Sequence, residues 1–239
     1  MNADVTPHGW RVFAQDPAVL IHTYSFGPGT SNALAVRGAA GLLVLSPPYR
    51  ARQGLFDDLA RFGNVCALVA SNAFHHLGIR EWKARFPNAP VFAPAQSIAR
   101  VKRQTGLEDI RPVAAAAPLA GHGIELVDMP YYRTGEVLVR LETERGRAWY
   151  VTDLIMNMPE LPRHPIFGAL FKLTGSAPGL KYNNVGPVFM VKDRKALKRW
   201  LAGEYAKAPP RWLIATHGDV ADLAADLEGA RRLFGAVTR

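Results

Sequence analysis

The sequence VCALVASNAFHHLG, residues 65–78, joins an apolar run to a polar loop that ends in two histidines. Residues 65–70 are apolar throughout, which is typical of a strand covered on both faces. Residues 71–76 are mostly polar, and residues 77–86 carry apolar side chains at helical spacing. The stretch therefore predicts a strand, a loop and a helix, with two adjacent imidazoles at the loop–helix junction.

The segments on either side continue this alternation of strands and helices. Short apolar runs predict strands at 10–13, 18–26, 32–37, 41–46, 90–93, 123–129, 136–142, 147–152 and 211–216. Helical spacing predicts helices at 50–62, 95–104, 193–205 and 220–234, whereas residues 111–121 fit neither pattern. The order favours an α/β fold class in a single domain, 1–239. A Pro- and Gly-rich stretch, about 159–187, is expected to be an irregular insert and a candidate lid.

The composition narrows the class of protein. With 239 residues and 49% hydrophobic content, the chain can bury a large core. No apolar run approaches about 18 residues, so we expect no membrane span and no membrane partner. Cys66 is the only cysteine, which excludes an intramolecular disulfide, and the first sixteen residues do not resemble a secretion signal. A cytoplasmic location is the expectation.

The formal net charge of +9 raises the question of an anionic partner. Lys and Arg residues are scattered, and no block of five or six like charges or aromatic-interleaved basic module occurs. We therefore expect a solvated basic surface, with nucleic acid an unlikely partner. The partner expected instead is a small-molecule substrate or ligand of unknown identity, and the sequence does not indicate an oligomeric state.

Four short motifs, in order, resemble those of the metallo-β-lactamase superfamily. Residues 71–78 stand where that family has His-x-His-x-Asp-His, and residues 129–135 stand where it has a Pro-Gly-His-Thr loop. Two later strands end at Asp153 and at His217, as in the family, whereas Ser46 replaces its usual Asp after an early strand. The resemblance implies a metallo-β-lactamase-like αββα sandwich, with two mixed sheets flanked by helices. The chain also resembles uncharacterised proteins of the DUF4336 type.

The departures from the family pattern bear on the metal sites. Ser71, Ala73 and Tyr132 stand at the positions of the three histidines that hold the first metal, so the resemblance implies that this site is lost. The second site is implied to persist as a set of three imidazoles and one carboxylate. These predicted ligands are His75, His76, Asp153 and His217. Imidazole and carboxylate suit one divalent ion, Zn, Fe or Mn.

Each of these residues also has a purely structural interpretation. A His–His pair is common at a helix start, and Asp153 can accept backbone donors at a strand end. Asp219 can serve as the N-cap of a final helix that follows His217. The remaining histidines, 8, 22, 122 and 164, have no partner spacing and are interpreted as structural or exposed.

Three functions remain open. The first is a single-metal hydrolase whose ion activates a water molecule, with substrate contacts from Tyr132, Tyr182 and Asn183. The second is a catalytically inactive descendant of the fold that binds a ligand or a protein. The third, ranked last, is a nucleic-acid-binding protein. No catalytic residue is assigned from the sequence.

Overall fold

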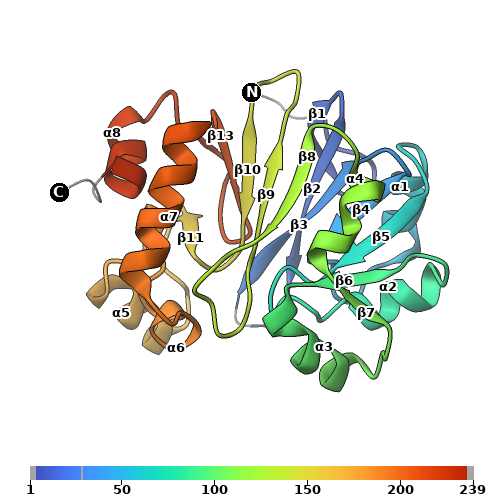
Figure 1. Ribbon diagram of the computed structural model, residues 1–239, viewed down its shortest axis with the longest axis horizontal. Helices are drawn as coiled ribbons and strands as arrows, with labels where there is room; N and C mark the ends of the chain where they lie inside the picture. The colour runs from blue at the N-terminus through green and yellow to red at the C-terminus, as the bar shows by residue number, and fades with distance from the viewer. Residues whose placement is uncertain (1–3, 28, 236–239) are drawn as a thin grey trace.

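In the computed structural model, which describes residues 4–27 and 29–235, two β-sheets lie face to face and helices cover their outer faces (Figure 1). The predicted αββα sandwich is therefore confirmed. The ends of the predicted domain 1–239, and Pro28, lie outside the described residues. Where the chain is described, none of its helices is both long enough and apolar enough to cross a bilayer.

The first sheet has seven strands in the order β1-β2-β3-β4-β5-β6-β7. Their bounds are β1 Arg11–Gln15, β2 Ala18–Ser25, β3 Thr30–Arg37, β4 Leu42–Leu45, β5 Val65–Val69, β6 Val91–Ala93 and β7 Ile110–Pro112. Strands β1 to β4 form an antiparallel meander, and β4 to β7 run parallel. A parallel neighbour needs a crossover, which explains the helices between β4, β5, β6 and β7.

The second sheet has five strands in the order β14-β13-β10-β9-β8. Their bounds are β8 Ile124–Asp128, β9 Val137–Leu141, β10 Ala148–Val151, β13 Trp212–Ala215 and β14 Ala221–Asp222. Strands β10 and β13 pair in parallel, so their carboxyl ends lie at the same edge. A separate hairpin consists of β11 (Ile155–Met158) and β12 (Gly179–Tyr182).

The helices fall into two groups that lie on opposite sides of the sandwich (Figure 1). Beside the first sheet are α1 (Gln53–Ala60), α2 (Ile79–Arg85) and α3 (Ile98–Thr105). Beside the second are α5 (Pro165–Leu173), α6 (Pro187–Met190), α7 (Arg194–Lys207) and α8 (Leu227–Ala230), which continues into the π-helix η3 (Arg231–Gly235). The short helix α4 (Ala117–Ala120) and the 3₁₀ turns η1 (Ala95–Ser97) and η2 (Val113–Ala116) complete the set.

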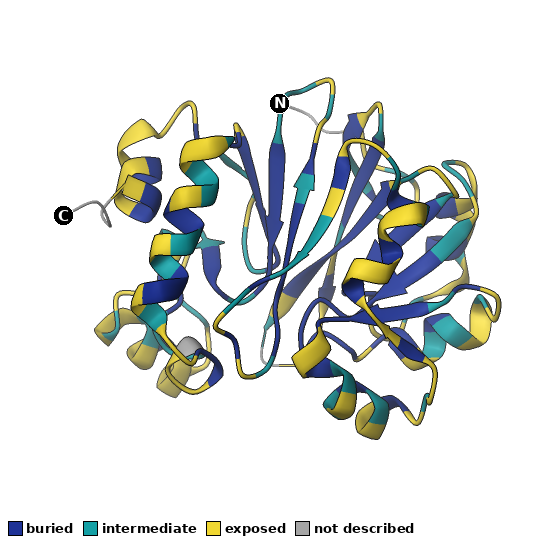
Figure 2. Ribbon diagram, in the orientation of Figure 1, coloured by how far each residue is buried: buried dark blue, intermediate teal, exposed yellow. Residues whose placement is uncertain are grey.

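The buried side chains form three layers that match this arrangement (Figure 2). One layer lies between the sheets and includes Val69, Val139 and Ile214. A second joins the first sheet to α1 and α2, and a third joins the second sheet to α7 and η3. Strand β5 contributes to both of the first two layers, because alternate side chains point to opposite faces. This double burial explains the continuous apolar run at 65–70.

Two expectations from the sequence were wrong. The stretch 159–187 is not irregular, because it holds α5 and β12 and the first residue of α6. The final helix does not span 220–234: residues after His217 first form β14, and α8 begins only at Leu227. Its N-cap is Asp226, whose carboxylate accepts a hydrogen bond from the backbone N–H of Gly229, and not Asp219. Apolar spacing alone could not separate the short edge strand from the helix that follows it.

Asp58, a buried residue of α1, ties the amino-terminal segment to the first sheet's helix layer. Its carboxylate accepts hydrogen bonds from the Thr6 hydroxyl and from the His8 backbone N–H at 2.7 Å, and it contacts His8 Nδ1 at 3.1 Å. Burial raises the pKa of this carboxyl, but the hydrogen bonds from Thr6 and His8 outweigh burial and leave the pKa below its usual value.

We predict that Asp58→Asn lowers the free energy of unfolding at neutral pH by roughly 2 kcal/mol, because charge-assisted hydrogen bonds are lost. A lowered carboxyl pKa stabilises the fold above the unfolded-state value, and this contribution is lost as pH falls through the folded-state value. Urea denaturation should therefore show the difference shrinking in acid. The control is Asp57→Asn, an exposed position on the same helix, which should change little at any pH.

Candidate metal centre

The candidate site forms where the carboxyl ends of three strands meet between the sheets. Val151 of β10 pairs in register with Ala215 of β13, so Asp153 and His217, each two residues further along, leave the same edge together. The loop after β5 reaches them through an antiparallel bridge between Asn72 and Glu136. Residues far apart in the sequence are therefore brought to one place by strand register.

Three donor groups converge at this edge. His75 Nε2 lies 3.2 Å from Asp153 Oδ1, and His217 Nε2 lies 3.1 Å from the same oxygen. The ligand atoms of His75, Asp153 and His217 all lie within 4.8 Å of one another, which makes them a group that can hold a metal ion. Among the described residues no other cluster of His, Cys, Asp and Glu meets this criterion.

The orientation of His217 is fixed by a second contact. Its Nδ1 lies 2.8 Å from the carbonyl oxygen of Thr30, an acceptor, so Nδ1 carries a hydrogen and Nε2 faces Asp153. Burial lowers the pKa of His217, but the hydrogen bond and charge of Asp153, with the Thr30 carbonyl, outweigh it and raise the pKa. Asp153 and the Thr30 carbonyl therefore stabilise the protonated imidazole relative to that of a free histidine.

His75 is held by the loop that carries it. The side-chain oxygen of Asn72 accepts hydrogen bonds from the backbone N–H groups of Phe74 at 2.8 Å and His75 at 3.0 Å. The His75 ring is buried, and its Nδ1 has no hydrogen-bond partner among the described residues. Because Nε2 is the nitrogen that faces Asp153, Nδ1 is the ring nitrogen on the side away from the carboxylate.

A second carboxyl, Glu136, lies behind Asp153. The Asn72 Nδ2 atom lies 2.8 Å from Asp153 Oδ2 and 3.2 Å from Glu136 Oε2, and so bridges the two carboxyls. The Leu154 backbone N–H donates to Glu136 Oε1 at 3.1 Å.

Burial, followed by the charge of Asp153, raises the pKa of Glu136 to about 8. Asp153 instead keeps a pKa well below its usual value, because the charges and hydrogen bonds of His75 and His217 outweigh its burial. Sequence reasoning missed both Asn72 and Glu136, since neither occupies a motif position.

His76, the fourth predicted ligand, is not in the group that the structure brings together. Its side chain is buried, and its pKa is lowered by burial and by the charge of Arg100. Residues 75 and 76 both lie in the turn that precedes α2, and only the His75 ring belongs to the group around Asp153. The assignment of His76 as a ligand stays a prediction.

The three positions at which the family resemblance would place further histidines carry neutral groups. Ser71 Oγ accepts a hydrogen bond from Ser46 Oγ at 2.9 Å, and Ser46 Oγ also accepts from the Tyr150 hydroxyl at 2.9 Å. Ala73 is buried. Tyr132 is buried as well, and its hydroxyl has no hydrogen-bond partner among the described residues. These side chains offer no imidazole for a second ion.

Two predicted substrate contacts already have internal partners. The Tyr182 hydroxyl donates to the Leu233 carbonyl at 2.7 Å, and Asn183 Oδ1 accepts from the backbone N–H of Val185 at 2.9 Å. The hollow beside them measures about 10 Å³, room for at most about one water molecule. Substrate binding by Tyr132, Tyr182 and Asn183 therefore stays a prediction.

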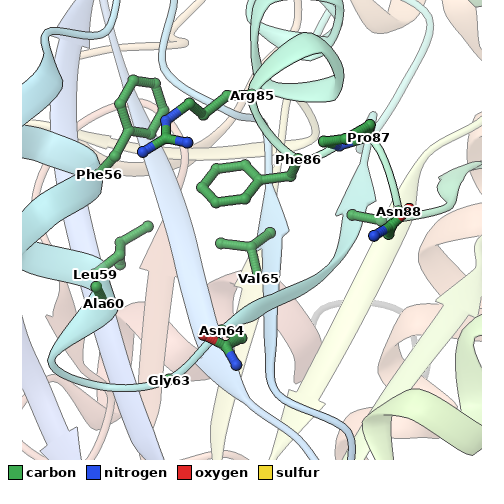
Figure 3. Close-up of a pocket in the computed structure, with 11 residues that line it drawn as sticks. Phe56, Leu59, Ala60, Gly63, Asn64, Val65, Arg85, Phe86, Pro87 and Asn88 are labelled. Atoms are coloured by element: carbon green, nitrogen blue, oxygen red, sulfur yellow. The ribbon is translucent and has the colours of Figure 1, made fainter.

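A larger cavity, about 260 Å³, lies elsewhere (Figure 3). It is lined by α1, by the end of α2 and by residues 63–65 at the start of β5. The Arg85 guanidinium lies over the rings of Phe56 and Phe86 in this cavity. The candidate metal centre follows the opposite, carboxyl end of β5, so the two features are separate.

Comparison with solved structures places this architecture in the metallo-β-lactamase fold. DIM-1 metallo-β-lactamase aligns with 99% of this chain and 97% of its own, at 14% identity and a TM-score of 0.54. FIM-1 from Pseudomonas aeruginosa, solved in its mono-zinc form, aligns with 98% of each chain at 14% identity and a TM-score of 0.60. A flavo di-iron protein mutant from Thermotoga maritima aligns with 99% of this chain and 61% of its own, at 10% identity and a TM-score of 0.62.

No family model matches the sequence, and no curated protein is significantly similar to it. The fold prediction is confirmed, whereas the finer resemblance to DUF4336-type proteins stays a prediction. TM-scores of 0.54–0.62 show the shared architecture, whereas identities of 10–14% leave the chemistry to be argued from this chain's own residues.

We predict that Glu136 makes the metal-free protein less stable as pH rises. An unfolded glutamate ionises near its usual pKa of 4.5, whereas Glu136 in the fold keeps its proton up to about 8. Folding then requires proton uptake between these values, and the free energy of unfolding should fall by at most about 1.4 kcal/mol per pH unit. Chemical denaturation at several pH values, in chelator, measures this slope. Glu136→Gln should flatten it, and the exposed control Glu125→Gln should leave it unchanged.

Proposed function

We propose that this protein is a single-metal hydrolase, with one divalent ion held by His75, Asp153 and His217. The observation that carries the proposal is the contact of two imidazoles, from separate segments, with one oxygen of a half-buried carboxylate. His76 is a predicted fourth ligand. The substrate and the identity of the metal are left open among zinc, iron and manganese.

The residues present fit one such ion. His217 Nδ1 donates to the Thr30 carbonyl, so a neutral His217 turns an Nε2 lone pair toward the carboxylate. This lone pair and the carboxylate oxygen repel each other unless a proton or a cation lies between them. His75 contributes a buried ring whose Nε2 faces the same carboxylate oxygen. A divalent ion with one carboxylate and neutral imidazoles leaves a net positive centre, which favours an anion or hydroxide.

A bound divalent ion would lower the pKa of a coordinated water and polarise the scissile group. The chain's own residues prepare that chemistry. Thr30 sets the His217 tautomer, and Asn72 holds both the His75 backbone and the outer Asp153 oxygen. Glu136, protonated at neutral pH, adds no second negative charge beside Asp153. The site thus keeps one ionised carboxylate for one ion.

The similar structures support the proposal in one respect. FIM-1 was solved in a mono-zinc form, so this fold accommodates a single ion. Here the hydroxyl chain of Ser46, Ser71 and Tyr150 occupies the neighbouring region without any metal-binding nitrogen. We therefore propose one ion and not two.

The first test is metal content. Protein produced without a histidine tag should contain about one equivalent of Zn, Fe or Mn by elemental analysis. His75→Ala and His217→Ala should each lose most of it, because each removes one of three converging ligands. His22→Ala is the matched control: this histidine is largely buried, donates to the Gly9 carbonyl and lies outside the cluster.

The His76→Ala variant then decides the ligand number. Full retention of metal assigns three protein ligands, whereas loss equal to that of His75→Ala assigns four. Metal-free protein whose stability is unaffected by chelator would contradict the proposal and leave the inactive ligand- or protein-binding alternative.

The second test is hydrolysis by metal-loaded protein. Chromogenic β-lactam, ester and phosphodiester substrates sample the bonds that a metal-bound water can attack. We expect turnover of at least one class, reduced about a hundredfold or more in Asp153→Asn, since the ion loses its only carboxylate ligand. Turnover equal in wild type and Asp153→Asn would indicate a contaminant. Bound metal with no turnover in any class would reduce the centre to a structural or binding role.

A further inference from the structure

The segment 161–199 holds most of the chain's excess positive charge. It contains eight Lys and Arg residues against one Asp and no Glu, a net charge of +7 out of +9 for the whole chain. Six of these cations are exposed and have no carboxylate partner among the described residues. They are Arg163, Lys172, Lys181, Lys192, Lys195 and Arg199.

The same segment also exposes large apolar side chains. On α5, Leu173 is 86% exposed and Ile166 70%, and on α6 Phe189 is 80% exposed. Figure 2 shows both helices as mostly exposed ribbon at one end of the molecule. Exposed apolar residues that cluster, in contrast to single ones, mark an interaction surface.

Helix α5 approaches the rest of the chain most closely at a glycine. Gly168 is its only buried residue, and a Cβ there would lie 2.7 Å from the Pro162 carbonyl oxygen. Around the helix, at 100° per residue, Ile166, Phe167, Leu170 and Leu173 point away from Gly168 over an arc of roughly 120°. The apolar arc of α5 therefore faces outward.

Hydrogen bonds through Asn184, which precedes α6, link the end of α5 to the start of α7. Asn184 Nδ2 donates to the Thr174 carbonyl at the end of α5, at 3.0 Å. Arg194, the first residue of α7, donates to Asn184 Oδ1 at 2.7 Å. Helix α6 lies between these two points in the sequence, and Figure 1 shows α5 and α6 next to each other. We call α5, α6 and the six exposed cations the α5–α6 surface.

We infer that the α5–α6 surface binds the face of an anionic lipid bilayer. Outward apolar side chains beside lysines and arginines are the features of an interfacial helix, whose apolar face enters the headgroup boundary while its cations meet anionic lipid. A second copy of the chain that used the same surface fits poorly, because two segments of net charge +7 would then face each other. A nucleic acid would match the charge but not the exposed Ile166, Leu173 and Phe189. The sequence led us to expect no membrane partner because no span was found, but interfacial binding needs no span.

The test is co-sedimentation of the full chain with vesicles of phosphatidylcholine alone or mixed with phosphatidylglycerol. We expect binding to the anionic vesicles, and at least about tenfold weaker binding to the neutral ones. The triple variant I166S/L173S/F189S removes exposed apolar area and should weaken binding to anionic vesicles about tenfold or more. The double variant K172E/K181E should do the same by charge reversal.

Matched controls separate this surface from general basicity. The variant V5S/L227S removes apolar side chains that are also more than half exposed, and R61E/R231E reverses two exposed arginines on other elements. Both should bind as the wild type does. Circular dichroism checks that every variant is folded, and all targeted residues are exposed, so unfolding is not expected.

Absence of binding to anionic vesicles would overturn the inference. So would equal losses in the target and control charge variants, or no loss in the apolar triple variant, since either result means diffuse attraction of a basic protein. Tighter binding to single-stranded nucleic acid than to anionic vesicles, lost in K172E/K181E but not in I166S/L173S/F189S, would assign the surface to nucleic acid instead.

Discussion

One oxygen atom, Asp153 Oδ1, organises the centre of this molecule. Two imidazoles reach it, one from the loop after β5 in the first sheet and one from the end of β13 in the second. An ionised carboxylate can remain between the sheets only if positive charge or hydrogen-bond donors meet it there, because an uncompensated buried charge is costly. These polar contacts therefore link the two sheets, in addition to the apolar packing between them.

The surrounding polar groups follow from that constraint. Asn72 satisfies the other Asp153 oxygen and also the backbone at His75, so one amide side chain serves both the carboxylate and the loop. Glu136 lies too near Asp153 for both carboxyls to ionise easily, and its pKa is raised to about 8. The network behind the centre is thus neutral, and a single negative charge faces the imidazoles.

Next to this charged group lies a region that is polar but uncharged. The hydroxyls of Tyr150, Ser46 and Ser71 form a buried chain of hydrogen bonds. Such a chain satisfies its own members, whereas a pair of metal sites would need imidazoles on both sides. Of these two neighbouring groups, only the charged one contains imidazoles.

Sequence alone determined the α/β fold class, because apolar periodicity and the fully apolar run at 65–70 depend on local spacing and burial, whereas the sandwich arrangement came from the family resemblance. The ordered motifs also singled out His75, Asp153 and His217. Only the tertiary structure separated His75 from His76, since the direction of neighbouring side chains depends on how the loop enters α2. It alone brought Asn72 and Glu136 beside Asp153, through a bridge between strands far apart in the chain. Only the tertiary structure also revealed α5 and the start of α8. From the sequence we had predicted an irregular insert in place of α5, and one longer helix that included α8. Their boundaries are set by long-range packing and capping contacts that no window of local sequence contains.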